Sequence, residues 1–112
     1  MIIQIFGTKK CKETQKAVRF FKERKIKIQQ IDLNQKGMSK GELRKVGSSV
    51  GVENMIDTDS TLFLNKGLKF ASYDVIDTLF LYPTMMFTPV VREGNRATIG
   101  NKPDVWKKWL SS

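Results

Sequence analysis

Cys11 is the only cysteine among the 112 residues, and its side chain is the one best suited to nucleophilic chemistry. It follows an apolar run that ends at Gly7, and it precedes a segment with helical periodicity. Free backbone N–H groups at the start of a helix carry partial positive charge and stabilise a thiolate. The nearby Lys9, Lys10 and Lys12 would act in the same direction. The position predicts a reactive thiol with a lowered pKa, and the alternative is a small buried hydrophobe.

A proline far along the chain supports the reactive thiol. Thr88–Pro89 interrupts an apolar segment that otherwise has the composition of a strand. A proline inside a strand lacks the N–H that the ladder needs, so its presence requires a reason. We predict that the Thr88–Pro89 bond is cis and packs beside Cys11. The two features together predict a thiol pocket with a function.

The residue types exclude several kinds of site. The sequence contains no histidine, which excludes Ser-His-Asp and Cys-His catalysis and most zinc sites, and no metal is expected.

A lone cysteine cannot form an internal disulfide, and no secretory segment or long apolar run is recognisable, so we expect a cytoplasmic protein without membrane contact. The formal net charge is +9, but the lysines are spread from Lys9 to Lys108. We therefore expect them to confer solubility rather than to bind nucleic acid directly.

A βαβ unit is expected to position the cysteine. Branched apolar residues within 2–6 predict a buried strand, and the periodicity of 12–25 predicts an amphipathic helix. Residues 26–33 predict a second strand, although Gln29 and Gln30 break its alternation. Two strands joined through one helix should be parallel neighbours in a sheet.

Helices are expected in the middle of the chain. Ser39 and Glu42 predict a capping box at the start of a short helix. Helical turns are expected around 62–64, and Ser72 is predicted to cap a further helix that stops at Pro83.

The last third returns to strands and ends in a helix. The segment "MMFTPVV" predicts a strand, and a turn centred on Gly94–Asn95 joins it to "RATIG" as a hairpin. Pro103 is expected at the start of an amphipathic C-terminal helix. This order outlines a thioredoxin-like α/β fold with a helical insertion. We expect a single monomeric domain over residues 1–112, with the insertion at about 38–83.

The chain resembles the arsenate reductase (ArsC)/Spx family in four segments, "IQIFGTKKCKETQKA", "IDLNQKGMSKGEL", "YPTMMFTPVV" and "WKKWL". They follow the order of the family and cover essentially the whole chain. The resemblance implies a thioredoxin-like fold and makes Cys11 the counterpart of the family nucleophile. It also implies two kinds of activity. Arsenate reductases use one cysteine toward arsenate with glutaredoxin and glutathione, and Spx-like members bind the C-terminal domain of the RNA polymerase α subunit.

Two positions depart from the family pattern. Thr14 stands where a Cys-x-x-Cys member has its second cysteine, so an internal disulfide switch is absent. Thr88 stands where arsenate reductases have an arginine before the proline. A threonine hydroxyl cannot replace the guanidinium fork around an oxyanion, and nothing in the sequence aims Arg92 or Arg96 at Cys11. Threonine before proline is instead similar to the pattern of glutaredoxins and thioredoxins.

We therefore expect a thiol-based oxidoreductase in which Cys11 is a monothiol nucleophile and no cofactor is bound. The expected partners are glutathione or another small thiol as co-substrate, a protein disulfide, and glutaredoxin or thioredoxin. The alternatives are a non-enzymatic Spx-like protein that docks on the RNA polymerase α subunit, and glutaredoxin-dependent arsenate reduction. The residues expected to bind the substrate beside Cys11 are Thr8, Lys9, Lys10, Lys12, Thr14, Thr88 and Pro89.

Overall fold

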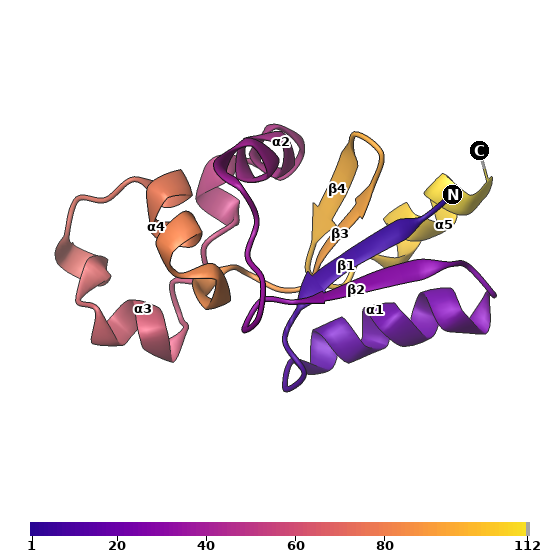
Figure 1. Ribbon diagram of the computed structural model, residues 1–112, viewed down its shortest axis with the longest axis horizontal. Coiled ribbons are helices and arrows are strands. Elements are labelled where there is room, and N and C mark those ends of the chain that lie inside the picture. Colours follow the sequence, from indigo (N-terminus) through magenta and orange to yellow (C-terminus); the bar gives the residue numbers. More distant parts are fainter. Residues whose placement is uncertain (112) are drawn as a thin grey trace.

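A four-stranded sheet with helices on both faces forms the main body of the computed structural model, which describes residues 1–111 (Figure 1). The strands lie in the order β2-β1-β3-β4, and their bounds are β1 Ile3–Gly7, β2 Ile28–Asp32, β3 Val90–Glu93 and β4 Arg96–Ile99. β1 and β2 are parallel, as the βαβ pattern predicts. β3 runs antiparallel to both β1 and β4. β2 and β4 are therefore the two edges of the sheet.

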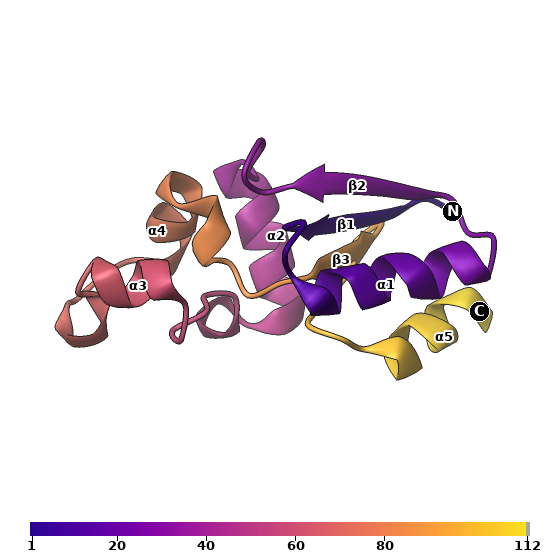
Figure 2. The same cartoon turned by 90° about the horizontal axis from the view of Figure 1, so that it is seen from below.

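Helices α1 (Lys12–Glu23) and α5 (Pro103–Ser111) cover one face of the sheet (Figure 2). Side chains alternate along a strand, so Ile3 and Ile5 of β1 both face this layer. They pack with the apolar faces of both helices, and Trp106 of α5 is fully buried among them. This layer fixes the position of α1, and with it the loop that carries Cys11.

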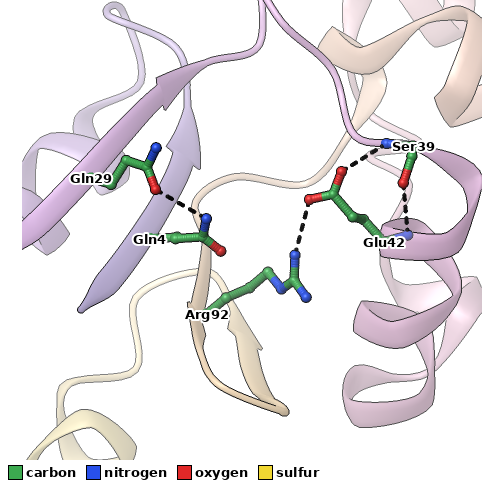
Figure 3. A network of polar contacts seen from close by, with 5 residues as sticks. All are labelled: Gln4, Gln29, Ser39, Glu42 and Arg92. Atoms are coloured by element: carbon green, nitrogen blue, oxygen red, sulfur yellow. Dashed lines mark hydrogen bonds and ion pairs between the residues drawn. The ribbon is translucent and has the colours of Figure 1, made fainter. Parts of the chain in front are cut away.

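Helix α2 (Lys40–Val50) covers the opposite face, where Phe6 of β1 is buried with Leu43 and Val46. The predicted capping box is confirmed, because Ser39 Oγ accepts from the Glu42 backbone N–H and the Glu42 carboxylate accepts from the Ser39 N–H. The same carboxylate accepts from Arg92 Nη1 at 3.2 Å, and this polar network joins α2 to the sheet (Figure 3).

The part of the insertion that follows α2 projects from one end of the sheet as a small helical lobe (Figure 1). It contains α3 (Thr61–Asn65), α4 (Val75–Leu81) and the short 3₁₀ turns Val52–Asn54, Leu68–Phe70 and Pro83–Met85. The predicted turns around 62–64 are confirmed as α3. The prediction that Ser72 caps the next helix is wrong. Asp74 directly precedes α4, and its carboxylate accepts from the Asp77 N–H, which leaves Ser72 outside the helix. None of the helices in the described part of the chain is long and apolar enough to cross a membrane.

The third strand is shorter than the sequence predicts. β3 begins at Val90, whereas Met86 makes only an isolated bridge with Ile56. Pro89 has no N–H for a ladder, so it precedes the strand instead of lying inside it. The predicted hairpin turn is confirmed at Gly94–Asn95, where Gly94 has a φ of 58°.

Replacement of Thr98 by valine is expected to destabilise the sheet-to-α5 contact. Trp106 Nε1 donates to Thr98 Oγ1 at 2.8 Å, and both residues are buried. Thr98→Val keeps the volume but leaves the indole N–H without an acceptor, which should lower the free energy of unfolding by about 1–3 kcal/mol. Urea denaturation measures this change. The exposed Thr58 provides the control, and an equal effect of Thr58→Val would contradict the prediction.

Candidate functional site

Cys11 lies in the loop between β1 and α1, at the residue that caps the helix. The Cys11 N–H donates to Thr8 O at 3.2 Å, which closes a turn, and the Cys11 carbonyl accepts the first helical bond from Gln15 N–H at 3.2 Å. The Gln15 side chain also donates to Lys9 O at 2.7 Å. The thiol is half-buried, and the loop that carries it is held at both ends by backbone contacts. Sγ is thus placed at the start of α1 with access to solvent.

The Thr88–Pro89 peptide bond is cis, and it lies beside Cys11 as predicted. Thr88 Oγ1 donates to Cys11 Sγ at 3.1 Å, and Sγ in turn lies 4.0 Å from the Thr88 carbonyl oxygen. Pro89 is fully buried behind this contact. The two features that the sequence places 77 residues apart therefore form one site.

Backbone hydrogen bonds from the insertion and from β4 hold the segment that precedes β3. The Phe87 N–H donates to Met55 O at 2.7 Å, and the Asp57 N–H donates to Met85 O at 2.8 Å. On the other side, Gly100 N–H donates to Pro89 O at 2.9 Å. The insertion thus has a structural role in the site, because it fixes the loop that presents Thr88 to the thiol.

The pKa of Cys11 is lowered from its ordinary value. Partial burial raises this pKa, but the hydroxyls of Thr14 and Thr88 and the backbone N–H groups of Thr14 and Glu13 together outweigh the burial. Thr88 is the hydroxyl whose geometry is that of a hydrogen bond to Sγ, whereas Thr14 Oγ1 is buried without a hydrogen-bond partner. The thiolate is therefore stabilised by dipoles of the helix start and by hydroxyl groups.

The lysines around the cysteine do not act as predicted. Lys9, Lys10 and Lys12 are exposed, and the causes of the lowered pKa are hydroxyl and N–H donors instead. Water screens such exposed charges, so their effect on the thiol is small. Glu13 carries a charge that would oppose the thiolate, but its backbone N–H favours the thiolate and its carboxylate is paired with Lys16.

Of the seven residues expected to bind the substrate, three contact Cys11: Thr8 from the loop, Thr14 from the start of α1 and Thr88 from the segment that precedes β3. Pro89 follows Thr88 through the cis bond and is buried, and substrate binding by these residues stays a prediction. Gly7 also belongs to this arrangement, although it was predicted only as the end of the first strand. A Cβ at Gly7 would lie 2.3 Å from Thr14 Oγ1, so only glycine lets Thr14 pack against the end of β1. A glycine directly between a strand and the cysteine loop was the signal for such a close approach.

Arg92 and Arg96 are engaged away from the thiol. Arg92 pairs with Glu42 on the α2 side of the sheet, and Arg96 pairs with Glu93 within the hairpin. Within residues 1–111, no arginine makes a hydrogen bond to Cys11, and no group of three His, Cys, Asp or Glu side chains could hold a metal ion. The groups at the sulfur are hydroxyls and backbone donors, and no guanidinium of the described residues is among them.

Replacement of Thr88 by valine is expected to raise the pKa of Cys11, because it removes the hydroxyl that donates to Sγ at 3.1 Å. The ultraviolet absorbance of the thiolate, followed against pH, measures this change. Thr8→Val is the matched control, since it makes the same chemical change next to Cys11 at a hydroxyl that donates no hydrogen bond to the sulfur. Equal titration curves for wild type and Thr88→Val would contradict the prediction.

A cysteine at the start of the first helix, bonded to the residue before a cis-proline on the β2-β1-β3-β4 sheet, defines a thioredoxin-like protein. The chain matches the ArsC family over residues 6–109, and it belongs to that family. Membership of this family and the thioredoxin-like fold support a thiol-based oxidoreductase-like role.

Solved structures with the same fold include an arsenate reductase from Vibrio cholerae. That chain is 18% identical with a TM-score of 0.83, and the match covers 96% of this chain and 97% of that one. An arsenate reductase (ArsC) related protein from Brucella melitensis is 19% identical with a TM-score of 0.68, over 100% and 97% of the two chains. A glutaredoxin from Archaeoglobus fulgidus is 10% identical with a TM-score of 0.51, over 98% and 86%. No curated protein matches the chain.

Proposed function

We propose that the protein is a monothiol oxidoreductase in which the Cys11 thiolate attacks a disulfide. The observation that carries this proposal is the hydrogen bond of 3.1 Å from Thr88 Oγ1 to Cys11 Sγ, next to the cis-proline. The bond favours the thiolate, which is the reactive form of a cysteine in disulfide exchange. The half-buried sulfur remains accessible to a substrate.

The reaction has two exchange steps. Cys11 Sγ forms a bond to one sulfur of the substrate disulfide while the S–S bond breaks, and the other sulfur leaves as a thiolate that takes a proton from water. Thr14 occupies the position from which a second cysteine could resolve the mixed disulfide, so an external thiol must do so. Glutathione or another small thiol attacks the mixed disulfide and releases Cys11 as a thiolate. A cysteine thiol of glutaredoxin or thioredoxin can carry out the same attack in place of the small thiol.

A direct test is the formation of a mixed disulfide with oxidised glutathione, followed by intact mass. We expect the wild type to gain one glutathione and to lose it again when reduced glutathione is added. Cys11→Ser should gain none, and Thr88→Val should react more slowly near neutral pH. A wild-type protein that remains unmodified under these conditions, while its thiol reacts after unfolding, would overturn the proposal.

Arsenate reduction is the less favoured enzymatic alternative. Thr88 replaces the arginine that precedes the proline in arsenate reductases, and Arg92 and Arg96 are paired with Glu42 and Glu93. An arsenate oxyanion beside Cys11 would therefore lack guanidinium partners. Arsenate-dependent turnover in the presence of glutaredoxin and glutathione would favour this alternative over the monothiol reaction.

An Spx-like docking function has one observation in its favour. The insertion exposes large apolar side chains, among them Phe70 at 92% and Leu81 at 67% of their surface. Exposed apolar residues of this size suit contact with another protein, for which the RNA polymerase α subunit is the candidate. Docking does not require the thiol, so Cys11→Ser should still bind the isolated α subunit. Absence of binding by both wild type and Cys11→Ser would exclude this function.

A further inference from the structure

A groove separates α1 from the edge strand β2, on the same face of the sheet as α5. It encloses about 530 Å³ and is lined from β1, β2, α1 and the cysteine loop, by residues that include Ile5, Thr14, Arg19 and Gln30. We refer to it as the α1–β2 groove. Its volume lies in the range of sites that bind ligands. It is distinct from the contact between Cys11 and Thr88, since neither residue lines it.

The groove explains one of the two polar residues that break the pattern of β2. Gln29 faces the α2 side of the sheet, where Gln4 Nε2 donates to its Oε1 at 3.1 Å (Figure 3). Gln30 is in register with Ile5, so it faces α1, yet it is exposed. Helix α1 therefore leaves the β2 edge uncovered on this face. A polar residue occupies a position that packing under the helix would otherwise make apolar.

The groove contains an unsatisfied polar group. Thr14 lines it with only 9% of its surface exposed, and Thr14 Oγ1 is buried without a hydrogen-bond partner. Buried hydroxyls in folded proteins nearly always have a partner, so this group is available to a ligand or to the nearby thiolate. The floor beside it is apolar, with Ile5 and Val18.

The groove is positively charged at its rim. Lys9, Arg19 and Lys22 line it, and none of these three takes part in an ion pair within residues 1–111. The surrounding segment, residues 9–27, contains nine Lys and Arg against two Glu, so much of the net charge of +9 arises here. A cationic rim of this kind attracts anionic partners and accelerates their association.

Two carboxylates also line the groove, but they do not cancel the attraction. Asp32 Oδ1 accepts a hydrogen bond from the Asn34 N–H at 2.9 Å, which engages this carboxylate in a local turn. Glu23 is the last residue of α1, at the end of the helix opposite Cys11. Asp32 is in register with Gly7, so it lies with Lys9 at the cysteine end of the groove, whereas Arg19 and Lys22 lie in the second half of α1, toward Glu23. Three cations face these two carboxylates, which leaves the rim with a net positive charge.

The shape of the groove favours an extended chain as its occupant. Three consecutive residues of the edge strand β2, Gln30, Ile31 and Asp32, line the groove, so it runs along this strand beside the free edge of the sheet. An edge strand offers unpaired backbone groups to an added strand, and the side-chain amide of the exposed Gln30 can bond to further peptide groups. Thr8 and Lys9 form one end of the groove, next to Cys11.

We infer that the α1–β2 groove binds an extended acidic peptide segment next to the disulfide of a protein substrate of Cys11. This inference rests on the proposed disulfide exchange and names the class of its substrate. The acidic side chains pair with Lys9, Arg19 and Lys22, the peptide backbone lies along the edge of β2, and the disulfide reaches Sγ past Thr8. The exchange step itself is the one described above.

The experiment compares peptides that carry a disulfide to a small aromatic thiol, whose release is followed by absorbance. One peptide has an aspartate run beside the disulfide, a second has asparagine in its place, and a third has lysine. At low salt we expect the acidic peptide to react at least about threefold faster than the asparagine peptide, and the lysine peptide to react slowest. The preference should decrease as the salt concentration rises. Equal rates for all three peptides would overturn the inference and leave the exchange activity intact.

Two charge variants locate the effect. Arg19→Gln removes a cation that lines the groove, so the ratio of acidic to asparagine rates should fall toward one. Lys27→Gln removes a cation of the same basic segment at an exposed residue that does not line the groove and takes part in no ion pair within residues 1–111, and its ratio should match wild type. Equal losses in both variants would show general attraction by the basic segment and would also overturn the inference.

Binding without chemistry separates the inference from the proposed function. Cys11→Ser cannot exchange, yet it should bind the disulfide-free acidic peptide in calorimetry, and Arg19→Gln introduced into it should weaken that binding. Binding by Cys11→Ser together with no exchange by wild type would contradict the monothiol reaction and retain the groove. No binding of the acidic peptide, or binding only of a small dicarboxylate, would overturn the assignment to a peptide.

Discussion

Alkylation of Cys11 by iodoacetamide is expected to reach half of its maximal rate at a pH below about 8.5, the ordinary value of a cysteine thiol. The hydroxyl and backbone donors at Sγ lower the pKa of Cys11 against the effect of burial. The rate should rise with pH through this lowered pKa and then level off, because only the thiolate reacts. As the pH falls below the lowered pKa, the thiol becomes protonated and the rate decreases in proportion. The rate constant measured across a series of pH values gives the midpoint.

Cys11→Ser is expected to abolish the reaction entirely, since the chain has no other cysteine. The denatured wild-type protein is the matched reference, because unfolding removes the Thr88 hydroxyl and the helix start from the sulfur. Its midpoint should lie at the ordinary value, above that of the folded protein. A folded midpoint equal to or above the denatured one would contradict the lowered pKa and would favour a structural role for Cys11.

Trp106→Ala is expected to produce the largest loss of stability among single substitutions considered for this protein. The side chain of Trp106, on α5, is fully buried between this helix, α1 and the sheet. Its ring centroid lies 5.3 Å from those of both Phe20 and Phe21. Removal of a buried aromatic side chain leaves a cavity and costs about 3–5 kcal/mol. Small domains have only about 5–15 kcal/mol of stability, so the midpoint of urea unfolding should fall substantially.

Phe70→Ala is the matched control for this truncation, because Phe70 is 92% exposed in the insertion. Its effect should stay within about 0.5 kcal/mol of wild type. If Trp106→Ala does not fold, Trp106→Phe retains most of the buried volume and should give an intermediate loss. A change as small for Trp106→Ala as for Phe70→Ala would contradict the assignment of this residue to the core.

Local signals in the sequence were sufficient for the elements that hold the site. The spacing of apolar residues, together with Gly7 after the run 2–6, predicts the strand and the helix on either side of Cys11. Both elements depend on interactions between residues a few positions apart in the chain. The capping box at Ser39 and the turn at Gly94–Asn95 were predicted for the same reason. Errors occurred where two local signals competed. Asp74 capped α4 in place of Ser72, and the absent N–H of Pro89 moved the start of β3.

The functional contacts join residues that are distant in the chain, and the tertiary structure gives their geometry. Thr88 meets Cys11 across 77 residues, and Arg92 pairs with Glu42 across 50. The sequence predicted that Thr88–Pro89 would lie beside the cysteine, and the pairing of β3 with β1 brings the two segments together. The sequence could not show toward which group the side chain of Arg92 points, and the structure shows that it pairs with Glu42.

The sequence by itself therefore determined the type and order of the elements and the chemistry available at Cys11. The tertiary structure decided which groups reach the sulfur: hydroxyls and N–H groups instead of lysines and arginines. It also decided that α1 leaves the β2 edge open, which turns the unexplained Gln30 into part of a groove. The physical reason is that secondary structure follows from interactions between near neighbours. The environment of a thiol or a groove instead depends on how complete elements pack, which is set by the burial of residues throughout the chain.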